Sequence, residues 1–246
     1  MGTSKSYEGA KGNPNWSQLS GSVTRACETG TISDNSLSNI TSNFAKLLEG
    51  SNFGGRGKSK IGGRAGIRTA QKLGGFLNDV KNKGFRSALS FIGFDTTDTT
   101  KPNEAINYLL EYCAGVASSL DETAAKAAER KLLEKIGSDA KNFEELAKNF
   151  EEKIEEYGIE DLLIKYNTYY IYEHLSIDFY EKLIEEKGKA ATSNFYIQLI
   201  KFLGEKVKNI ARKRDLSKVH WAGKDGDELV KNILEDTLKA FENYEG

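Results

Sequence analysis

Residues 54–93 read GGRGKSKIGGRAGIRTAQKLGGFLNDVKNKGFRSALSFIG, and this stretch decides how the rest of the chain is interpreted. Its apolar residues recur every three or four positions, which predicts a helix over about 64–80. They are Ile67, Ala70, Leu73, Phe76, Leu77 and Val80. Gly74 and Gly75 lie inside this helix, where each glycine costs about 1 kcal/mol relative to alanine. We therefore expect another backbone packed closely against the pair, or a kink in the helix.

The rest of the chain shows the same helical period, without a convincing alternation of the kind found in strands. The predicted helices cover 36–48, 85–94, 102–120, 121–136, 142–157, 159–186 and 193–213, with a last helix after a polar loop at 215–225. Pro102 suits a first helical turn, Asn142 with Glu145 resembles a capping box, and Gly158 is expected to break the chain. The predicted fold class is all-α, a helical bundle with a flexible Gly/Ser-rich basic N-terminal arm.

The chain has a basic N-terminal part and an acidic C-terminal part, although its formal net charge is only −1. Residues 1–94 carry 13 Lys and Arg against 5 Asp and Glu, whereas residues 95–246 carry 22 against 31. The two parts should attract each other, or the basic part should meet an acidic partner. We predict three segments: a flexible arm over 1–34, a basic Gly-rich helical segment over 35–94, and an acidic helical bundle over 95–246.

The arm is defined by its composition, which is rich in Gly, Ser, Thr and Asn with few large apolar residues. Such a segment buries too little apolar area to offset its conformational entropy, so we expect residues 1–34 to be mobile.

A row of cations follows the arm, comprising Arg56, Lys58, Lys60, Arg64, Arg68 and Lys72. Arg64, Arg68 and Lys72 are four residues apart and share one helix face. This row could bind nucleic-acid phosphates. The favoured interpretation is that it docks on the acidic half of the same chain or on an acidic partner, because no base-stacking or recognition-helix pattern accompanies it.

The tyrosines, histidines and cysteines are interpreted as structural residues and not as parts of a binding or catalytic site. The tyrosines between Tyr166 and Tyr180 could line a pocket or interface, but core packing is favoured. His174 and His220 are far apart, and surface or half-buried positions are expected for both. No His, Cys and Asp set has metal-ligand spacing, and Cys27 and Cys113 make no disulfide framework. We therefore predict no cofactor, no metal, no enzymatic activity, no membrane span and a reducing cytoplasmic location.

The stretch MGTSKSYEGAKG (residues 1–12) and, after a linker, GGRAGIRTAQKLGGFLNDVKNKGFRSALSFIG (62–93) resemble the QatB family, a component of the bacterial Qat anti-phage defence system. The likeness lies in the Met-Gly-Thr-Ser start, the Gly/Ser-rich arm and the Gly-Arg-rich helical segment. It covers about the first 120 residues in pattern, and the remainder is similar only as helical sequence.

This resemblance implies a non-enzymatic protein that works beside an ATPase, a QueC-like enzyme and a TatD-like nuclease. It also implies that the QueC-like enzyme recognises or modifies the N-terminal glycine, which is Gly2 here, with Thr3 and Ser4 as its context. The first hypothesis is therefore a non-catalytic subunit of a defence complex with an accessible N-terminal arm. The alternative is a nucleic-acid-binding accessory protein that uses residues 56–72.

Overall fold

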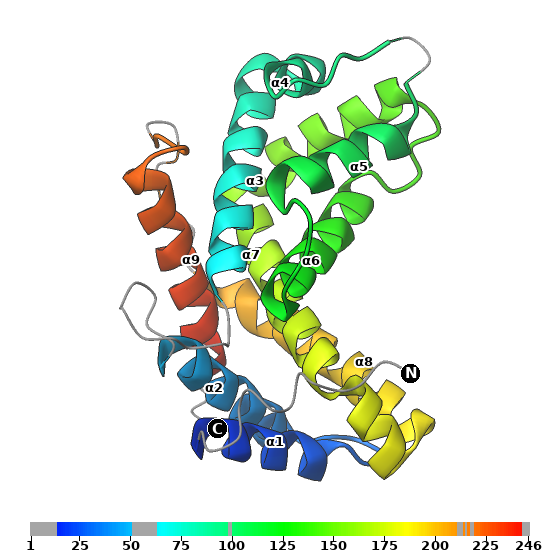
Figure 1. Cartoon of the computed structure of the whole chain (residues 1–246), viewed down its shortest axis with the longest axis vertical. Coiled ribbons are helices and arrows are strands. Elements are labelled where there is room, and N and C mark those ends of the chain that lie inside the picture. Colours follow the sequence, from blue (N-terminus) through cyan, green and yellow to red (C-terminus); the bar gives the residue numbers. More distant parts are fainter. Residues whose placement is uncertain are drawn as a thin grey trace.

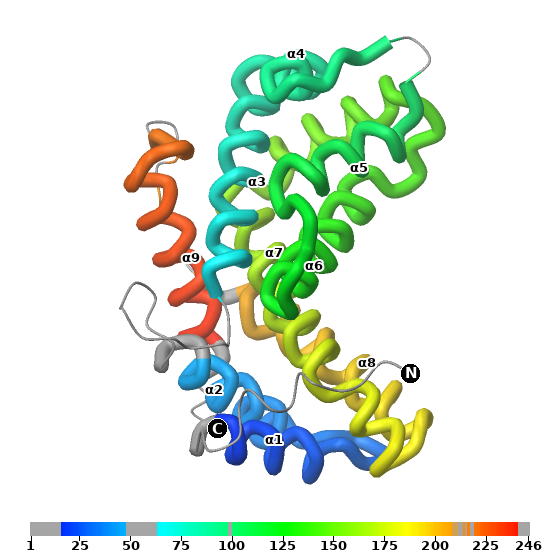
Figure 2. The backbone as a smooth tube through the Cα atoms, viewed as in Figure 1, coloured from blue at the N-terminus to red at the C-terminus, as the bar shows by residue number. Residues whose placement is uncertain are grey.

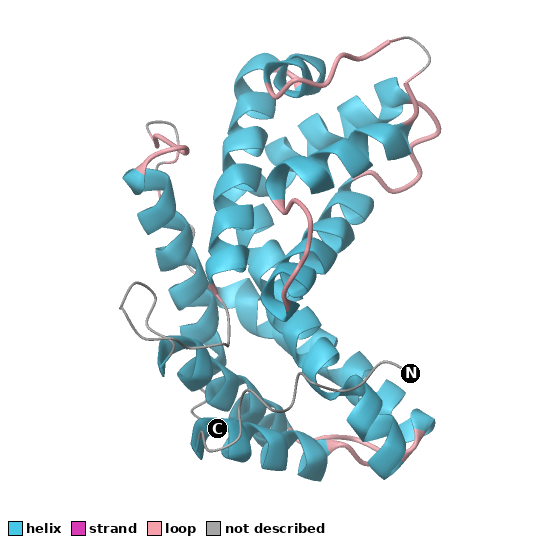
Figure 3. Ribbon diagram, in the orientation of Figure 1, coloured by secondary structure: helices cyan, strands magenta, loops and turns pink. Residues whose placement is uncertain are grey.

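The structure is a computed structural model that describes residues 14–50, 63–97, 100–210, 214, 216 and 219–242. These residues form helices and loops, and none of them lies in a strand (Figure 3), which confirms the all-α prediction. The helices are α1 (Pro14–Ala26), α2 (Asp34–Gly50), α3 (Arg64–Lys83), α4 (Phe85–Phe91), α5 (Pro102–Cys113), α6 (Leu120–Ile136), α7 (Phe143–Lys187), α8 (Lys189–Lys206) and α9 (Lys224–Glu242).

Helix α3 packs against five other helices. These are α4, α5, α6, α7 and α9, and Figure 1 shows α3 between α9 on one side and α6 and α7 on the other. Its predicted apolar residues are all buried, because the 3.6-residue period places them on one side of the helix. Buried side chains from α1 to α9 form one hydrophobic core, so residues 35–94 and 95–246 share that core despite their opposite charge.

The expected mobile arm over 1–34 is wrong for the part that the structure describes. Helix α1 occupies Pro14–Ala26, and Leu19, Val23 and Cys27 are completely buried against neighbouring helices. The ring of Trp16 stacks on Phe179 with 5.2 Å between ring centroids. The composition suggested too little buried apolar area for this segment. Its few apolar residues recur at helical spacing, and α2 and α7 cover them. Residues 1–13 lie outside the described residues.

Helix α7 joins the two ends of the molecule (Figure 2). It runs from the end that holds α4 and α5 to the end that holds α1 and α8. Gly158 interrupts it with φ 76° and ψ 161°, a conformation that favours glycine, so the predicted break is confirmed. The predicted start is also confirmed, since the Asn142 side chain accepts a hydrogen bond from the Glu145 amide at 2.9 Å.

Candidate functional site

Two aromatic rings lie where side chains would project from the glycines of α3. A Cβ atom on Gly66 would lie 2.6 Å from the Tyr170 ring, and one on Gly74 would lie 2.1 Å from the Trp221 ring. At Gly74 the close approach is made by an aromatic side chain and not by the second backbone that was expected. The glycines of α3 thus determine how near α7 and the loop before α9 can come.

The loop before α9 is anchored on α3 by Trp221. This residue is only 8% exposed, whereas the neighbouring His220 is exposed as expected. The Gln71 side chain on α3 donates hydrogen bonds to the Trp221 carbonyl at 2.6 Å and to the Gly223 carbonyl at 3.0 Å. The indole ring and the Gln71 amide together hold the start of α9 against α3.

The predicted basic row is only partly described. Arg56, Lys58 and Lys60 lie outside the described residues, as do Gly2, Thr3 and Ser4. The remaining members lie on α3 and share one face of it, as predicted. They are the exposed residues Arg64, Arg68 and Lys72.

Two of these cations contact the acidic half of the same chain. Arg68 Nη2 lies 3.3 Å from Glu122 Oε1, and Lys72 Nζ donates a hydrogen bond to the Tyr112 carbonyl at 2.8 Å. The Lys72 ammonium also lies 5.2 Å from the centroid of the Tyr112 ring. The sequence favoured docking on the acidic half of the same chain or on an acidic partner, and for Arg68 and Lys72 the contacts seen here are with the same chain.

A groove of about 460 Å³ opens beside these cations, and we call it the α3 groove. It is bounded by α3, the end of α4, the end of α5 and the Trp221 loop. Its lining is Arg68, Gln71, Lys72, Gly75, Phe76, Asn78, Asp79, Phe91, Ile92, Tyr112, Trp221 and Ala222. It therefore combines cations, amides and aromatic rings on one surface.

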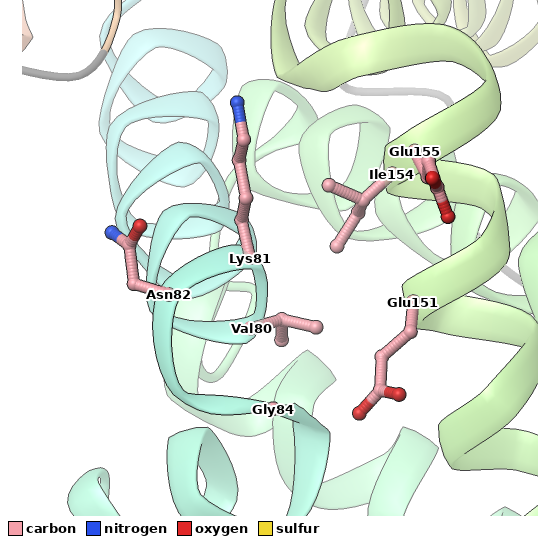
Figure 4. A pocket seen from close by; sticks show the side chains of 7 residues that line it. All are labelled: Val80, Lys81, Asn82, Gly84, Glu151, Ile154 and Glu155. Atoms are coloured by element: carbon pink, nitrogen blue, oxygen red, sulfur yellow. The ribbon is translucent and has the colours of Figure 1, made fainter.

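A second groove of about 420 Å³ lies between the end of α3 and α7 (Figure 4). Val80 and Ile154 point toward each other across it, while the Lys81 side chain points away. The Glu151 carboxylate accepts a hydrogen bond from the Phe85 amide at 3.0 Å, so it already caps the start of α4. The Glu151 carboxylate in this groove already holds α4 against α7. Its lining has no aromatic residue, unlike the lining of the α3 groove.

Beneath the start of α3 lies a buried acid–histidine cluster. The Asp121 carboxylate accepts hydrogen bonds from the backbone amides of Gly63 at 3.2 Å and Ala65 at 3.0 Å, and another from the Tyr170 hydroxyl. Gly63 has no side chain to cap α3, so Asp121 caps it from the first turn of α6. His174 Nε2 lies 3.4 Å from Asp121, and His174 Nδ1 lies 3.7 Å from Asp178.

The cluster shifts the pKa of both charged partners. Burial alone would raise the pKa of Asp121, but hydrogen bonds from His174, Tyr170 and the Ala65 amide lower it to about 2. Burial alone would lower the pKa of His174, but its contacts with Asp121 and Asp178 raise that pKa to about 9. At neutral pH the two groups therefore form a buried ion pair.

We predict that this pair makes the stability of the protein depend on alkaline pH. The pKa of His174 is about 9 in the fold and about 6.5 in an unfolded chain, so its stabilisation is complete below pH 6.5. Raising the pH from 6.5 to 9 should lower the free energy of unfolding by about 3 kcal/mol, measured by urea denaturation. His174→Gln should remove this dependence, whereas the control His220→Gln should retain it. An unchanged pH dependence in His174→Gln would contradict the assignment.

Another buried acid, Glu129, lies farther along α6. Burial raises its pKa well above the usual range, and the Cys113 thiol and Ala114 amide beside it only partly oppose that shift. Among the described residues, no three His, Cys, Asp or Glu side chains are grouped so that they could hold a metal ion. No described helix is long and apolar enough to cross a membrane.

Sequence reasoning missed the most constrained residues. His174, expected at a surface or half-buried position, is 3% exposed. The preference for core packing of the tyrosines is confirmed for Tyr166 and Tyr170, which are completely buried. One signal was available: Tyr166, Tyr170 and His174 are four residues apart, which places them on one face of a helix. Nothing local indicated that Asp121 would reach that face.

A family model matches most of the chain. The family model described as "Qat anti-phage system associated protein QatB" matches residues 54–241, which include α3 to α9 and the Trp221 loop. No curated protein and no solved structure matches the chain. The family match does not include residues 1–53. The likeness of the N-terminal part to this family therefore depends on its sequence pattern alone.

Proposed function

The chain belongs to the QatB family and is thus a component of the Qat anti-phage system, and we propose that it serves there as a non-catalytic subunit of a defence complex. The match over residues 54–241 supports the defence-system part of this proposal, and it includes α3 and the helices α4 to α7 that pack against it. The acid–histidine cluster supports a structural role. The side chains of Asp121 and His174 are 13% and 4% exposed and already bind α3 and α7.

The finer part of the proposal concerns the N-terminal arm. The Met-Gly-Thr-Ser start resembles the family pattern, and a QueC-like partner is proposed to recognise or modify Gly2, with Thr3 and Ser4 as context. An ATPase and a TatD-like nuclease are proposed as the other partners. The QueC-like enzyme would use ATP to activate a carboxylate as an adenylate, with release of pyrophosphate, and the Gly2 amine would attack the adenylate to form an amide and release AMP.

The chemistry of the amine favours Gly2 over nearby lysines. An α-amino group has a pKa near 8, whereas a lysine has a pKa near 10.4 in reference peptides. A larger fraction of the terminal amine is therefore unprotonated and nucleophilic at pH 7. This difference would act in addition to any recognition of Thr3 and Ser4.

We predict a mass increase confined to the N-terminal peptide when the protein is expressed with its QueC-like partner, and none when it is expressed alone. Gly2→Leu should abolish the increase, because a large second residue prevents removal of Met1. Lys5→Arg is the matched control and should be modified normally. Intact-mass and peptide mass spectrometry measure both results. Unmodified chain after co-expression, or an adduct on Lys5, would contradict the proposal.

A further inference from the structure

We propose that the α3 groove is a docking site for a short acidic segment of a protein partner. A carboxylate of that segment would lie between Arg68 and Lys72, and an apolar or aromatic side chain would lie beside Phe91. This proposal concerns a surface of α3 and does not depend on modification of Gly2.

The charges that face the groove favour an anionic group at one end of it. Lys83 Nζ lies 2.8 Å from Asp79 Oδ1, so the anion in the lining is already neutralised by a residue of the same helix. Arg68 has a single 3.3 Å contact with Glu122 and keeps 53% of its side chain exposed. Lys72 donates to a neutral carbonyl, which leaves its positive charge uncompensated there. Because Arg68 and Lys72 are one helical turn apart, one carboxylate can reach both.

The other end of the groove offers an apolar surface. The Phe91 ring is 71% exposed, although Phe85, Ala88 and Leu89 on the same short helix are buried. The Lys83 ammonium lies 4.3 Å from the centroid of the Phe91 ring and covers part of it. Two further aromatic residues, Phe76 and Trp221, also line the groove and are themselves buried. Aromatic residues and arginine are enriched where proteins bind other proteins.

The size of the groove limits what can occupy it. Its volume of about 460 Å³ is within the range of about 300–1,000 Å³ found for small-ligand pockets. This space accepts a few side chains of an extended segment rather than a whole helix. A segment with one carboxylate and one large apolar side chain satisfies both the size and the charge of the lining.

A nucleic acid fits the groove less well than an acidic peptide. Phosphate-backbone binding depends on several cations that follow the strand. Among the residues that line the groove only Arg68 and Lys72 are cations, which is too few to follow a strand of phosphates. The peptide is therefore favoured, and nucleic-acid binding becomes an outcome of the test.

The test is fluorescence anisotropy of the full chain with a labelled peptide in which Asp and Glu residues flank a Leu-Phe pair. The double variant Arg68→Gln with Lys72→Gln should weaken binding at least about tenfold, as expected for one charge-assisted hydrogen bond. Peptides with Asn and Gln in place of the acids, or Ala-Ala in place of Leu-Phe, should lose binding to a similar extent. Phe91→Ser should also weaken binding, and it keeps the test valid if the double variant fails to fold.

Lys81→Gln is the matched control, because Lys81 is exposed on the same helix but lines the second groove. Its dissociation constant should equal that of the unaltered protein. The proposal is overturned if the unaltered protein does not bind the peptide, or if Phe91→Ser and the double variant bind it as well as the control does. It is also overturned if a labelled oligodeoxythymidine binds with steep salt dependence and only that binding is lost in the double variant.

Discussion

Replacing Asp121 by alanine should lower the free energy of unfolding by about 3–5 kcal/mol, the cost of breaking a buried ion pair by removing one partner. The substitution would leave the charged His174 beside Asp178 alone and the amides of Gly63 and Ala65 without their acceptor. Urea denaturation at pH 6.5 measures the effect, because His174 is protonated there in the fold.

Two further variants test whether the loss of stability comes from the buried contacts of Asp121. Asp121→Asn keeps one of the two acceptor oxygens but removes the charge, so it should lose less stability than Asp121→Ala. Asp79→Ala is the control, because Asp79 pairs with Lys83 at the surface of α3 and such a pair contributes about 1 kcal/mol or less. Hydrogen exchange should accelerate most in the first turn of α3 in Asp121→Ala. Equal stability of Asp121→Ala and Asp79→Ala would show that the cluster does not hold α3.

Replacing Trp221 by alanine should destabilise the protein by about 3–5 kcal/mol, because a large buried ring would be removed from its place against α3. The cavity would lie over Gly74 and Gly75, which have no side chains to fill it. His220→Ala changes the exposed neighbour in the same loop and should have an effect within about 0.5 kcal/mol. Chemical denaturation of the two variants under identical conditions provides the comparison.

A double-mutant cycle tests the contact between Trp221 and Gly74 directly. Gly74→Ala alone should destabilise the protein by about 1–3 kcal/mol or more, because the added Cβ would lie 2.1 Å from the indole ring. In the Trp221→Ala background the same substitution should be neutral or stabilising, since alanine is favoured over glycine in a helix by about 1 kcal/mol. Additive effects of the two substitutions would exclude the proposed packing.

Local patterns in the sequence were sufficient to predict where the helices lie along the chain. The apolar period predicted α3 from Arg64 onward, and Asn142 and Gly158 predicted the start and the interruption of α7. These features depend on residues within one or two turns, where backbone sterics and capping act. Helix ends were less accurate: the helix expected over 102–120 ends at Cys113, and the one expected over 193–213 occupies Lys189–Lys206.

The sequence by itself determined an all-α chain, the place of α3 and the exposure of its cations, because each follows from the helical period. Only the tertiary structure decided that α1 is buried, that Trp221 lies on Gly74, and that Asp121 caps α3. Those contacts join residues that are tens or hundreds of positions apart, so no local pattern records them. They form because a glycine surface, an uncapped helix start and a charged histidine are each stabilised by a partner that folding brings from elsewhere in the chain.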